Sequence, residues 1–465
     1  MANANRRTRF TGRAALRSIT NDRRCKHCGY ESVLPGGHVG LRKTDDGVVG
    51  YAGLATCGKI WLCPVCNAKV MAKRAMEIGA VLLWADQNDL KVIWGSLTSR
   101  HSIADKLDHL IGLQTHAWRT IVSQRWWKDE NATKRVPHEC QANYATCNNV
   151  CNFDHLHAAD AGCEYQCIKQ FDTEWPDAAE GRVGYIRAAE LTVGANGWHP
   201  HFHPIIFYNG TTEEAEWHAA DIVGEWVEAV RSLGGEAQAD GSQQLKVLEG
   251  IAVFEALTGY VTKATYEAGF DFAKNGKAKT MALEPVWSQG KDGNFKTKKK
   301  GRTGRVKGTV SHWSLLVGIA QGLADEVDRW HELEDATRGH RMITWSRGIR
   351  AFAGVGVEKD DEAIAAEEVG SKEDTVCIIT ATGWETVRET PDVMAMILDV
   401  LEEHGWDAVA TLLDHFGIDY ATAENLADTT DTMHEDYAEA QRRDEFEKTV
   451  FRDIDELSDI YVNYV

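Results

Sequence analysis

The chain has 465 residues, is 43% hydrophobic and 26% charged, and carries a formal net charge of −19. This length is enough for two or three globular domains, and no stretch approaches the roughly 18 apolar residues of a membrane-spanning helix. The eleven cysteines are an odd number and no secretory signal precedes them, which argues against a disulfide-stabilised extracellular fold. These features predict a cytoplasmic protein that does not enter a membrane.

The negative charge is concentrated in the C-terminal part of the chain. Residues 351–465 contain 7 Lys and Arg against 30 Asp and Glu, whereas residues 1–350 contain 44 against 40. In the earlier part, positive charge gathers in the N-terminal arm MANANRRTRFTGRAALRS and in KDGNFKTKKKGRTGRVKG (291–308). The second run is either a solvated loop or a loop that contacts phosphates.

Residues 1–80 combine the basic arm with two CxxC pairs, Cys25/Cys28 and Cys63/Cys66, which 34 residues separate. The separation is longer than in common zinc ribbons, but each pair is a good half-site for zinc. Cys57, just upstream of the second pair, could replace one ligand. A redox CxxC and free buried cysteines are the alternatives. We predict a structural Zn²⁺ in an N-terminal module.

Residues 81–350 are expected to form the next domain. Its first elements are a strand followed by a polar turn (89–102) and a helix (102–127), and a Cys/His-rich insertion follows at about 130–175. Two CxxxC pairs in the insertion could hold a second structural zinc. This spacing is less diagnostic than CxxC, and three further Cys and His residues compete as ligands. The candidate ligands are Cys147, Cys151, Cys163 and Cys167.

A β-hairpin is predicted next, because Asn196-Gly197 separates RVGYIRAAELTVGA from WHPHFHPIIFY. Both flanking runs are rich in β-branched or aromatic residues, and Asn-Gly is typical of a two-residue type I′ turn. With this turn, residues whose numbers sum to 393 lie opposite each other. Glu190 then faces His203, and Thr192 faces His201.

Three histidines of this hairpin, His199, His201 and His203, share one face because strand side chains alternate. Two imidazoles and the carboxylate of Glu190 would then lie together, with their nearest Cβ atoms roughly 5 Å apart. Alternating histidines can also be ordinary surface or core residues. A His₂/Glu set with open coordination positions suits Mg²⁺ or Mn²⁺ acting as a Lewis acid on a phosphate, and zinc also fits.

Helices are predicted at 213–230 and 253–265, and the second carries a candidate nucleophile. Tyr260 and Lys263 are three residues apart and therefore lie on one face of this helix. A phenol has a pKa of about 10 and can attack phosphorus when a neighbouring cation activates it. The alternative is an ordinary half-buried tyrosine of an amphipathic helix.

The last elements lie on either side of residue 350. Residues 311–350 are expected to be helical and to end in MITWSRGIR. The acidic region 351–465 is expected to be mainly helical. Its stretch PDVMAMILDVLEEHGWDAVATLLDHFGI has the apolar periodicity of two short helices split by a glycine.

Three stretches of the chain are best considered together and in their order of occurrence: GSLTSRH (95–101), ELTVGANGWHPHFHPIIF (190–207) and YVTKATYE (260–267). Together they resemble the three motifs of the HUH endonucleases, and most closely those of rolling-circle replication initiator (Rep) proteins of bacterial plasmids and phages. WLCPVCNAKVMAKRA resembles the cysteine segment before the catalytic core of many Rep proteins, and ITWSRGIR (343–350) resembles a segment that follows the core. The likeness covers roughly residues 50–350.

The resemblance implies a mixed α/β fold with a central antiparallel sheet of the HUH type and helices on one face. His201 and His203 would be ligands of a catalytic Mg²⁺ or Mn²⁺, with Glu190 as the third. Tyr260 would attack a phosphodiester of single-stranded or extruded origin DNA, stay linked to the 5′-phosphate and free a 3′-hydroxyl. Lys263 would orient or neutralise the phosphate.

Other points stay open. His199 matches a histidine often seen in the family, but no role follows for it. A YxxxY pair is absent, so a second strand exchange would need a water, an acid such as Glu255 or another tyrosine. Host helicase and DNA polymerase are the expected partners besides DNA, and no oligomeric state is predicted. A transposase of the same chemistry and a non-catalytic zinc-dependent DNA-binding regulator are the alternatives.

The acidic region could fold back on the basic surfaces and weaken non-specific DNA binding, or it could recruit host replication proteins. A solvated acidic helical domain is the plainer interpretation.

Overall fold

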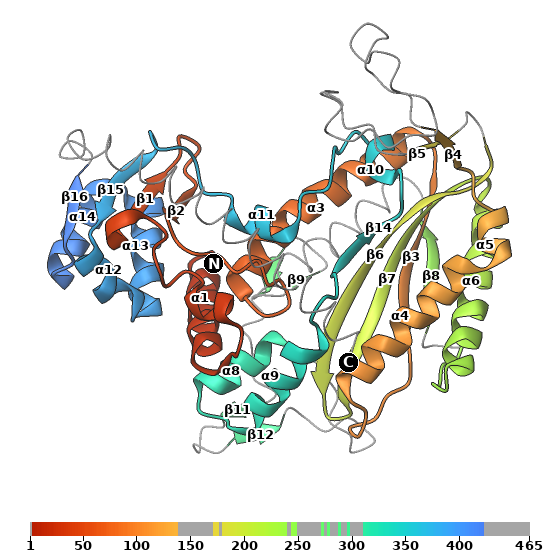
Figure 1. Cartoon of the computed structure of the whole chain (residues 1–465), viewed down its shortest axis with the longest axis horizontal. Coiled ribbons are helices and arrows are strands. Elements are labelled where there is room, and N and C mark those ends of the chain that lie inside the picture. The colour runs from red at the N-terminus through yellow and green to blue at the C-terminus, as the bar shows by residue number, and fades with distance from the viewer. Residues whose placement is uncertain are drawn as a thin grey trace, which may run out of the picture.

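The computed structural model describes residues 2–137, 171–175, 179–239, 243–248 and 310–422, together with short strands at 271–273, 277–279, 287–289 and 295–297. Its largest sheet is antiparallel and has the order β13-β6-β7-β3-β8, with β14 also paired to β6 (Figure 1). Its strands are β3 (Lys91–Thr98), β6 (Gly181–Gly194), β7 (Gly197–Asn209), β8 (Gln244–Leu248), β13 (Val310–Ser311) and β14 (Ile343–Trp345).

Helices cover both faces of this sheet, so the expectation of helices on one face is wrong. Helices α4 (Leu107–Ser123) and α6 (Thr212–Ser232) pack on the face that carries Ile206, whereas α3 (Pro64–Gln87) packs on the face that carries Ile205 and Phe207 (Figure 1). The reason is visible in β7. Its successive residues Ile205, Ile206 and Phe207 are all fully buried, and such an apolar run is typical of a strand covered on both faces.

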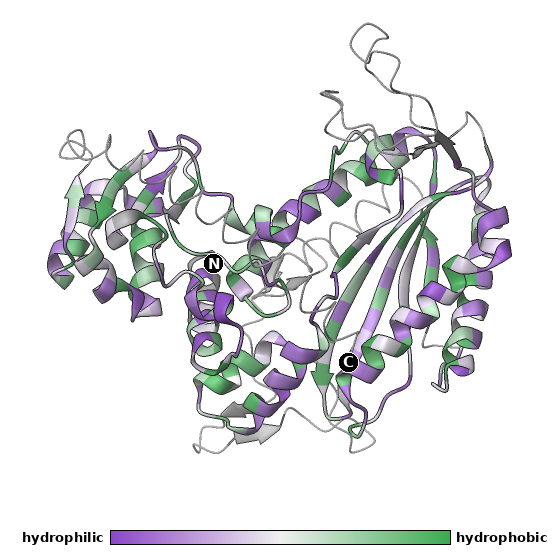
Figure 2. Ribbon diagram, in the orientation of Figure 1, coloured by the Kyte–Doolittle hydropathy of each residue, from purple (hydrophilic) through white to green (hydrophobic). Residues whose placement is uncertain are grey.

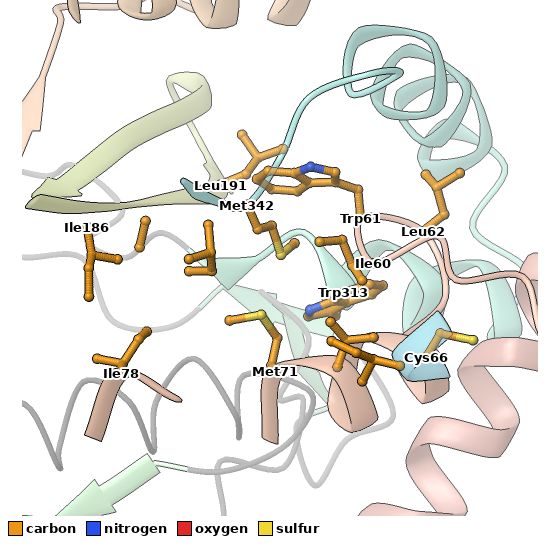
Figure 3. Close-up of a cluster of buried hydrophobic side chains, with 14 of the residues drawn as sticks. Ile60, Trp61, Leu62, Cys66, Met71, Ile78, Ile186, Leu191, Trp313 and Met342 are labelled. Carbon is orange, nitrogen blue, oxygen red and sulfur yellow. The ribbon is translucent and has the colours of Figure 1, made fainter. Parts of the chain in front are cut away.

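The larger core joins α3 to β6 and to the cysteine-bearing loop. Figure 3 shows Met71 and Ile78 of α3 and Ile186 of β6 pointing into one apolar cluster, with Trp61 and Trp313 packed nearby. This cluster holds the N-terminal module against the main sheet. In Figure 2, hydrophobic and hydrophilic residues alternate along the helices that cover the sheet, as expected for elements with one buried side.

A second sheet combines the two ends of the described chain. Its order is β16-β15-β1-β2, and all pairs are antiparallel. The basic helix α1 (Ala2–Ile19) lies beside α13 of the acidic region (Figure 1). The elements of this unit are β1 (Val39–Lys43), β2 (Val49–Ala52), β15 (Thr375–Ile379), β16 (Tyr420–Thr422), α12 (Ala381–Arg388), α13 (Pro391–His404) and α14 (Trp406–Phe416).

Several helix boundaries follow from local sequence. Thr211 and Glu214 form a reciprocal capping box at the start of α6. The two predicted helices of the acidic region are confirmed, and Gly405, with φ of +80°, separates them. Residues 311–350 differ from the expectation. After α8 (Trp313–Ala320) and α9 (Asp325–Ala336), the β-branched and aromatic stretch at 343–345 forms strand β14 along the edge of β6.

The remaining elements are short. They are α2 (Arg23–His27), η1 (Pro35–Gly37), α5 (Arg125–Asp129), α10 (Ile349–Phe352), α11 (Asp361–Ala366), and the strand pairs β4 (Lys134–Pro137) with β5 (Phe171–Glu174), β9 (Asp271–Ala273) with β10 (Lys277–Lys279), and β11 (Trp287–Gln289) with β12 (Phe295–Thr297). The predicted mixed α/β fold, with antiparallel sheets flanked by helices, is confirmed. Among the helices that the structure describes, none has the length and apolar character needed to cross a bilayer.

Candidate metal centres

The turn of the β6–β7 hairpin lies one residue earlier than predicted. Gly194 pairs with Gly197, so the two loop residues are Ala195 and Asn196. A type I′ turn needs positive φ at both, but Asp89 is the only non-glycine residue with positive φ in the described chain. Gly197 instead has φ of +88°, the pattern of a type I turn followed by a left-handed glycine bulge.

The hairpin register therefore differs from the predicted one by two residues. Glu190 lies opposite His201, and Thr192 lies opposite His199. A shift by two residues keeps every side chain on its face. Glu190 still lies on the face that carries His201 and His203, as predicted.

These three side chains converge. Oε2 of Glu190 lies 2.7 Å from Nε2 of His201 and 2.7 Å from Nε2 of His203. The three possible ligand atoms all lie within 4.8 Å of one another. Glu190 and His203 are each only 9% exposed. The arrangement is a compact set of one carboxylate and two imidazoles, largely shielded from water.

Backbone carbonyls hold both rings from the other side. Nδ1 of His201 lies 3.2 Å from the carbonyl oxygen of His199, and Nδ1 of His203 lies 3.0 Å from that of Gly95. A neutral ring whose Nδ1–H donates to a carbonyl presents a lone pair at Nε2. Both lone pairs then face the carboxylate of Glu190. A cation between these three groups would interact favourably with all of them. Metal-bound histidines in proteins are commonly oriented by carbonyls in this way, so a divalent metal fits the site.

Protonation of His203 would be a less favourable way than a bound cation to balance the charge of Glu190. Burial lowers the pKa of His203, although the hydrogen bond to Glu190 works in the opposite direction. The donor set of two imidazoles and one carboxylate suits Mn²⁺, Mg²⁺ or zinc. Which metal binds stays a prediction.

The stretch GSLTSRH (95–101), at the end of β3 and just after it, contributes further residues to the site. A Cβ atom on Gly95 would lie 1.4 Å from the carbonyl oxygen of Gln244, so only glycine fits between β8 and the histidines. Oγ1 of Thr98 lies 3.1 Å from Nε2 of His199, and the His101 ring stacks on the His199 ring at a centroid distance of 4.6 Å. Burial lowers the pKa of His199 to about 4.

The neutral His199 ring is thus fixed beside the candidate metal ligands, and its own backbone carbonyl holds the His201 ring. The sequence interpretation missed the individual roles of Gly95, Thr98 and His101. The available signal was a glycine inside an otherwise apolar strand, in a stretch already singled out as a motif.

A second set of possible ligands lies in the N-terminal module. The Sγ atoms of Cys28, Cys57, Cys63 and Cys66 lie within 4.8 Å of one another, and all four residues are buried. The separations are 3.7 Å for Cys28–Cys63, 3.5 Å for Cys28–Cys66 and 3.6 Å for Cys57–Cys66. Four thiolates placed tetrahedrally around zinc at 2.3 Å would be about 3.8 Å apart.

Cys57 occupies the place that the sequence interpretation assigned to Cys25. Cys25 lies beside Cys57 but outside the four-thiol set. Cys28 is the C-cap of α2, and Cys63 is the N-cap of α3. The loop between them folds so that Cys57 completes the set, a geometry that CxxC spacing does not encode. The cluster is compatible with the predicted zinc module.

One buried histidine connects the two centres. His312 lies with Nδ1 3.2 Å from the carbonyl oxygen of Leu191 and Nε2 3.2 Å from that of Trp61. Leu191 follows Glu190 in β6, and Trp61 lies in the loop between Cys57 and Cys63. Burial lowers the pKa of His312 to about 4, so the ring is neutral and its single N–H donates to one of the two carbonyls. No sequence pattern indicated this residue.

Several predicted site residues lie outside the described part of the chain. They are Tyr260, Lys263, Cys147, Cys151, Cys163 and Cys167. The basic run 291–308 also lies mostly outside it. The roles predicted for these residues stay predictions.

Comparisons with known proteins find similarity to two proteins of Streptomyces species. The chain is 28% identical over 394 residues to Protein rep of Streptomyces lividans, which covers 76% of each chain. It is 35% identical over 191 residues to the neomycin resistance protein of Streptomyces cyanogenus, which covers 38% of this chain and 36% of that protein. No protein-family model and no solved structure matches. The chain is therefore similar, over about three quarters of its length, to a Rep protein.

Proposed function

We propose that this protein initiates rolling-circle replication of a plasmid or phage by nicking and rejoining one DNA strand. The general role of replication initiator is supported by the similarity to Protein rep over 76% of the chain. The nicking chemistry rests on one observation. Glu190, His201 and His203 place three ligand atoms within 4.8 Å on a sheet face, with both rings oriented by carbonyls.

Glu190, His201 and His203 would hold Mg²⁺ or Mn²⁺. The bound ion would act as a Lewis acid on a non-bridging oxygen of the scissile phosphate. His199 and Gly95 keep Nε2 of each ligand ring directed at the site through their carbonyl oxygens. Because the site is largely buried, its charges act in a medium of low dielectric and are stronger than in water.

Tyr260 is the proposed nucleophile. Its phenolic oxygen forms a bond to phosphorus while the bond from phosphorus to the 3′-oxygen breaks. The leaving 3′-oxygen takes up a proton and becomes a free 3′-hydroxyl, and the phenol loses one, so the charge is conserved. Lys263 would lower the pKa of the phenol and neutralise the phosphate. The released 3′-hydroxyl is a primer for a host polymerase, and a host helicase would unwind the duplex ahead of it.

Because the proposed nicking is site-specific, the experiment uses single-stranded oligonucleotides from the replication origin, labelled at either the 5′ or the 3′ end and incubated with the full chain and Mn²⁺. Because the tyrosine would keep the 5′-phosphate, the 3′ label should move with the protein on a denaturing gel. The 5′ label should instead appear in a shorter free fragment. Tyr260→Phe or excess EDTA should abolish both products.

Tyr266→Phe is the matched control, because Tyr266 lies six residues further on and about 240° around the predicted helix. It should leave the adduct unchanged. An adduct that survives Tyr260→Phe would move the nucleophile elsewhere. Retarded DNA on a native gel without any adduct would favour a non-catalytic DNA-binding regulator.

A further inference from the structure

A cavity of about 350 Å³ lies behind the candidate metal site, on the opposite face of the β6–β7 hairpin. Ala189 and Phe202, which line it, alternate in their strands with Glu190 and His201, so their side chains point to the other face. Helix α4 forms one wall, and the loop before β14 forms the rim. Glu190 and His201 also line the cavity, so it adjoins the candidate metal ligands from the opposite face of the hairpin.

The cavity is positively charged. Arg119 of α4, Arg187 of β6 and Arg341 of the rim all line it, and so does His340. Among the described lining residues only Glu190 is acidic, and its carboxylate faces the histidines on the other side of the sheet.

Of the three arginines, only Arg341 has an acidic partner among the described residues. Arg341 lies 3.6 Å from Glu358, but its side chain is 70% exposed. Arg187 donates to the hydroxyl of Thr344 at 3.3 Å, and Arg119 and Arg187 have no ion-pair partner among the described residues. Burial, and then the charge of Arg119 beside it, lower the pKa of Arg187, although Tyr185 raises it. Guanidinium groups in such a setting suit a phosphate, which they bind in a bidentate way.

The walls of the cavity add apolar surface and unused polar atoms. Tyr185, Val122 and Phe202 provide apolar or aromatic surface. Oε1 of Gln114 and Nε1 of Trp118 are buried without a hydrogen-bond partner in the described structure, and so is Nε of Arg187. An unpaired buried polar atom is unfavourable, and a ligand with its own donors and acceptors would pair with it. A flat, polar-edged ring attached to a phosphate combines these properties.

We propose that this cavity binds a nucleoside phosphate. The ligand is either one nucleotide of the DNA strand that the protein cleaves or a free nucleotide that regulates it. The first source rests on the proposed function, and the second does not. A volume of about 350 Å³ lies at the lower end of the range for small-molecule sites, which suits a single nucleotide.

The test uses the full chain carrying Tyr260→Phe, in EDTA, so that binding is measured without cleavage. The probes are a fluorescein-labelled 12-nucleotide single strand of random sequence, deoxyadenosine 5′-monophosphate and the nucleoside deoxyadenosine. The variants are Arg119→Ala and Arg119→Lys. Arg125→Ala is the matched control, because Arg125 is an exposed arginine of the neighbouring helix α5 and its side chain is 92% exposed.

If the site binds a nucleotide of the strand, Arg119→Ala should weaken oligonucleotide binding about tenfold and reduce the slope of log affinity against log salt by about 0.7. Deoxyadenosine monophosphate should compete with the strand, and deoxyadenosine should compete at least about tenfold less well. Arg119→Lys should restore only part of the affinity, because lysine lacks the planar fork. Arg125→Ala should leave binding within about twofold of the parent chain.

If the site binds a free nucleotide, Arg119→Ala should weaken monophosphate binding about tenfold and leave oligonucleotide binding unchanged. Equal binding of all probes by Arg119→Ala and Arg125→Ala, with unchanged melting temperatures, would overturn the proposal. Because no adduct is measured, this result is independent of whether Tyr260 is the nucleophile.

Discussion

Single atoms decide which thiols can hold a zinc ion in the N-terminal module. Cys25 and Cys57 are both fully buried and lie beside each other, yet only Cys57 joins the set with Cys28, Cys63 and Cys66. A tetrahedral ion needs all four sulfurs at one distance from a common point. The two neighbouring thiols should therefore contribute very differently to zinc affinity.

We expect Cys57→Ser to lower zinc retention at least about tenfold, because a serine hydroxyl is a poor ligand for zinc. Cys25→Ser should retain zinc within about twofold of the unmodified chain, since Cys25 is not one of the four residues of the set. The measurement is the zinc-to-protein ratio after dialysis against graded concentrations of a chelator. Loss of zinc in Cys25→Ser but not in Cys57→Ser would show that the ligand set is the one expected from the CxxC pairs.

His312 should make stability depend on pH. Burial holds its pKa at about 4, well below the usual value of about 6.5 for the unfolded chain. Between these values only the unfolded chain binds the proton, so the stability present above pH 6.5 is lost as the pH falls towards 4. The slope is up to about 1.4 kcal/mol per pH unit.

The melting temperature should therefore fall more steeply between pH 7 and pH 5 for the natural chain than for His312→Gln. His109→Gln, at an exposed position of α4, is the control and should follow the natural chain. Parallel curves for all three proteins would mean that His312 does not titrate in this way.

Among the elements, α3 is fixed to the segment after β14 by a buried ion cluster. Glu77 of α3 accepts from Arg350 at 2.9 and 3.0 Å and from Arg74 at 2.9 Å. Burial alone would raise the pKa of Glu77, but the hydrogen bonds from the two arginines lower it. The same guanidinium of Arg350 lies 4.8 Å from the ring centre of Trp345. The segment ITWSRGIR thus contributes strand β14 to the sheet and, through Arg350, an ion pair that holds α3.

Glu77→Gln should destabilise the chain by about 3 kcal/mol, because it leaves the buried Arg350 with a neutral partner, whereas Arg74 keeps its ion pair with Asp361. The measurement is the midpoint of urea denaturation, with Glu216→Gln at an exposed position of α6 as the control. A loss no larger than that of the control would mean that the cluster is not a net source of stability.

The histidine face could be predicted from sequence, although the turn was misplaced. Side chains alternate with a period of two, so an error of two residues in register left Glu190 beside His201 and His203. Gly95 and His312 could not be assigned in the same way. Their contacts, with the carbonyls of Gln244 and of Trp61, depend on how separate elements pack. The choice of Cys57 over Cys25 depends on the path of a loop, which ligand spacing does not determine.

At the scale of the whole molecule, the acidic region is part of the fold and contacts the basic arm. Arg6 of α1 forms ion pairs with Asp399 and Glu402 of α13, and Arg7 lies 3.2 Å from Asp392. Part of the basic arm is therefore neutralised by the acidic region, which supports the version of the hypothesis in which this region limits non-specific DNA binding. Deleting residues 356–465 would not test it cleanly, because the region 375–422 supplies two strands of the second sheet.

The double variant Asp399→Asn/Glu402→Gln is a cleaner test. We expect it to raise affinity for a random-sequence duplex about tenfold at 50 mM salt, because Arg6 becomes available to phosphates. The gain should shrink above about 0.2 M salt. Fluorescence anisotropy measures this. The control is Glu373→Gln/Asp407→Asn, which makes the same charge change at two exposed positions that have no ion pair among the described residues. Equal gains in both variants would attribute the effect to net charge alone.

The second sheet also bears on how the protein is made. Val39 of β1 pairs with Ile379 of β15, so one edge of β1 has no partner strand until the ribosome has added about 340 further residues. At roughly 5–20 residues per second, this takes about 17 to 70 s. During that interval β1 and β2 form a two-stranded hairpin with one unpaired edge and an exposed apolar face. This hairpin must either be shielded by a chaperone or stay free of aggregation by itself. A nascent chain therefore cannot complete this unit before most of its length has been translated, and truncated products of interrupted translation would lack it.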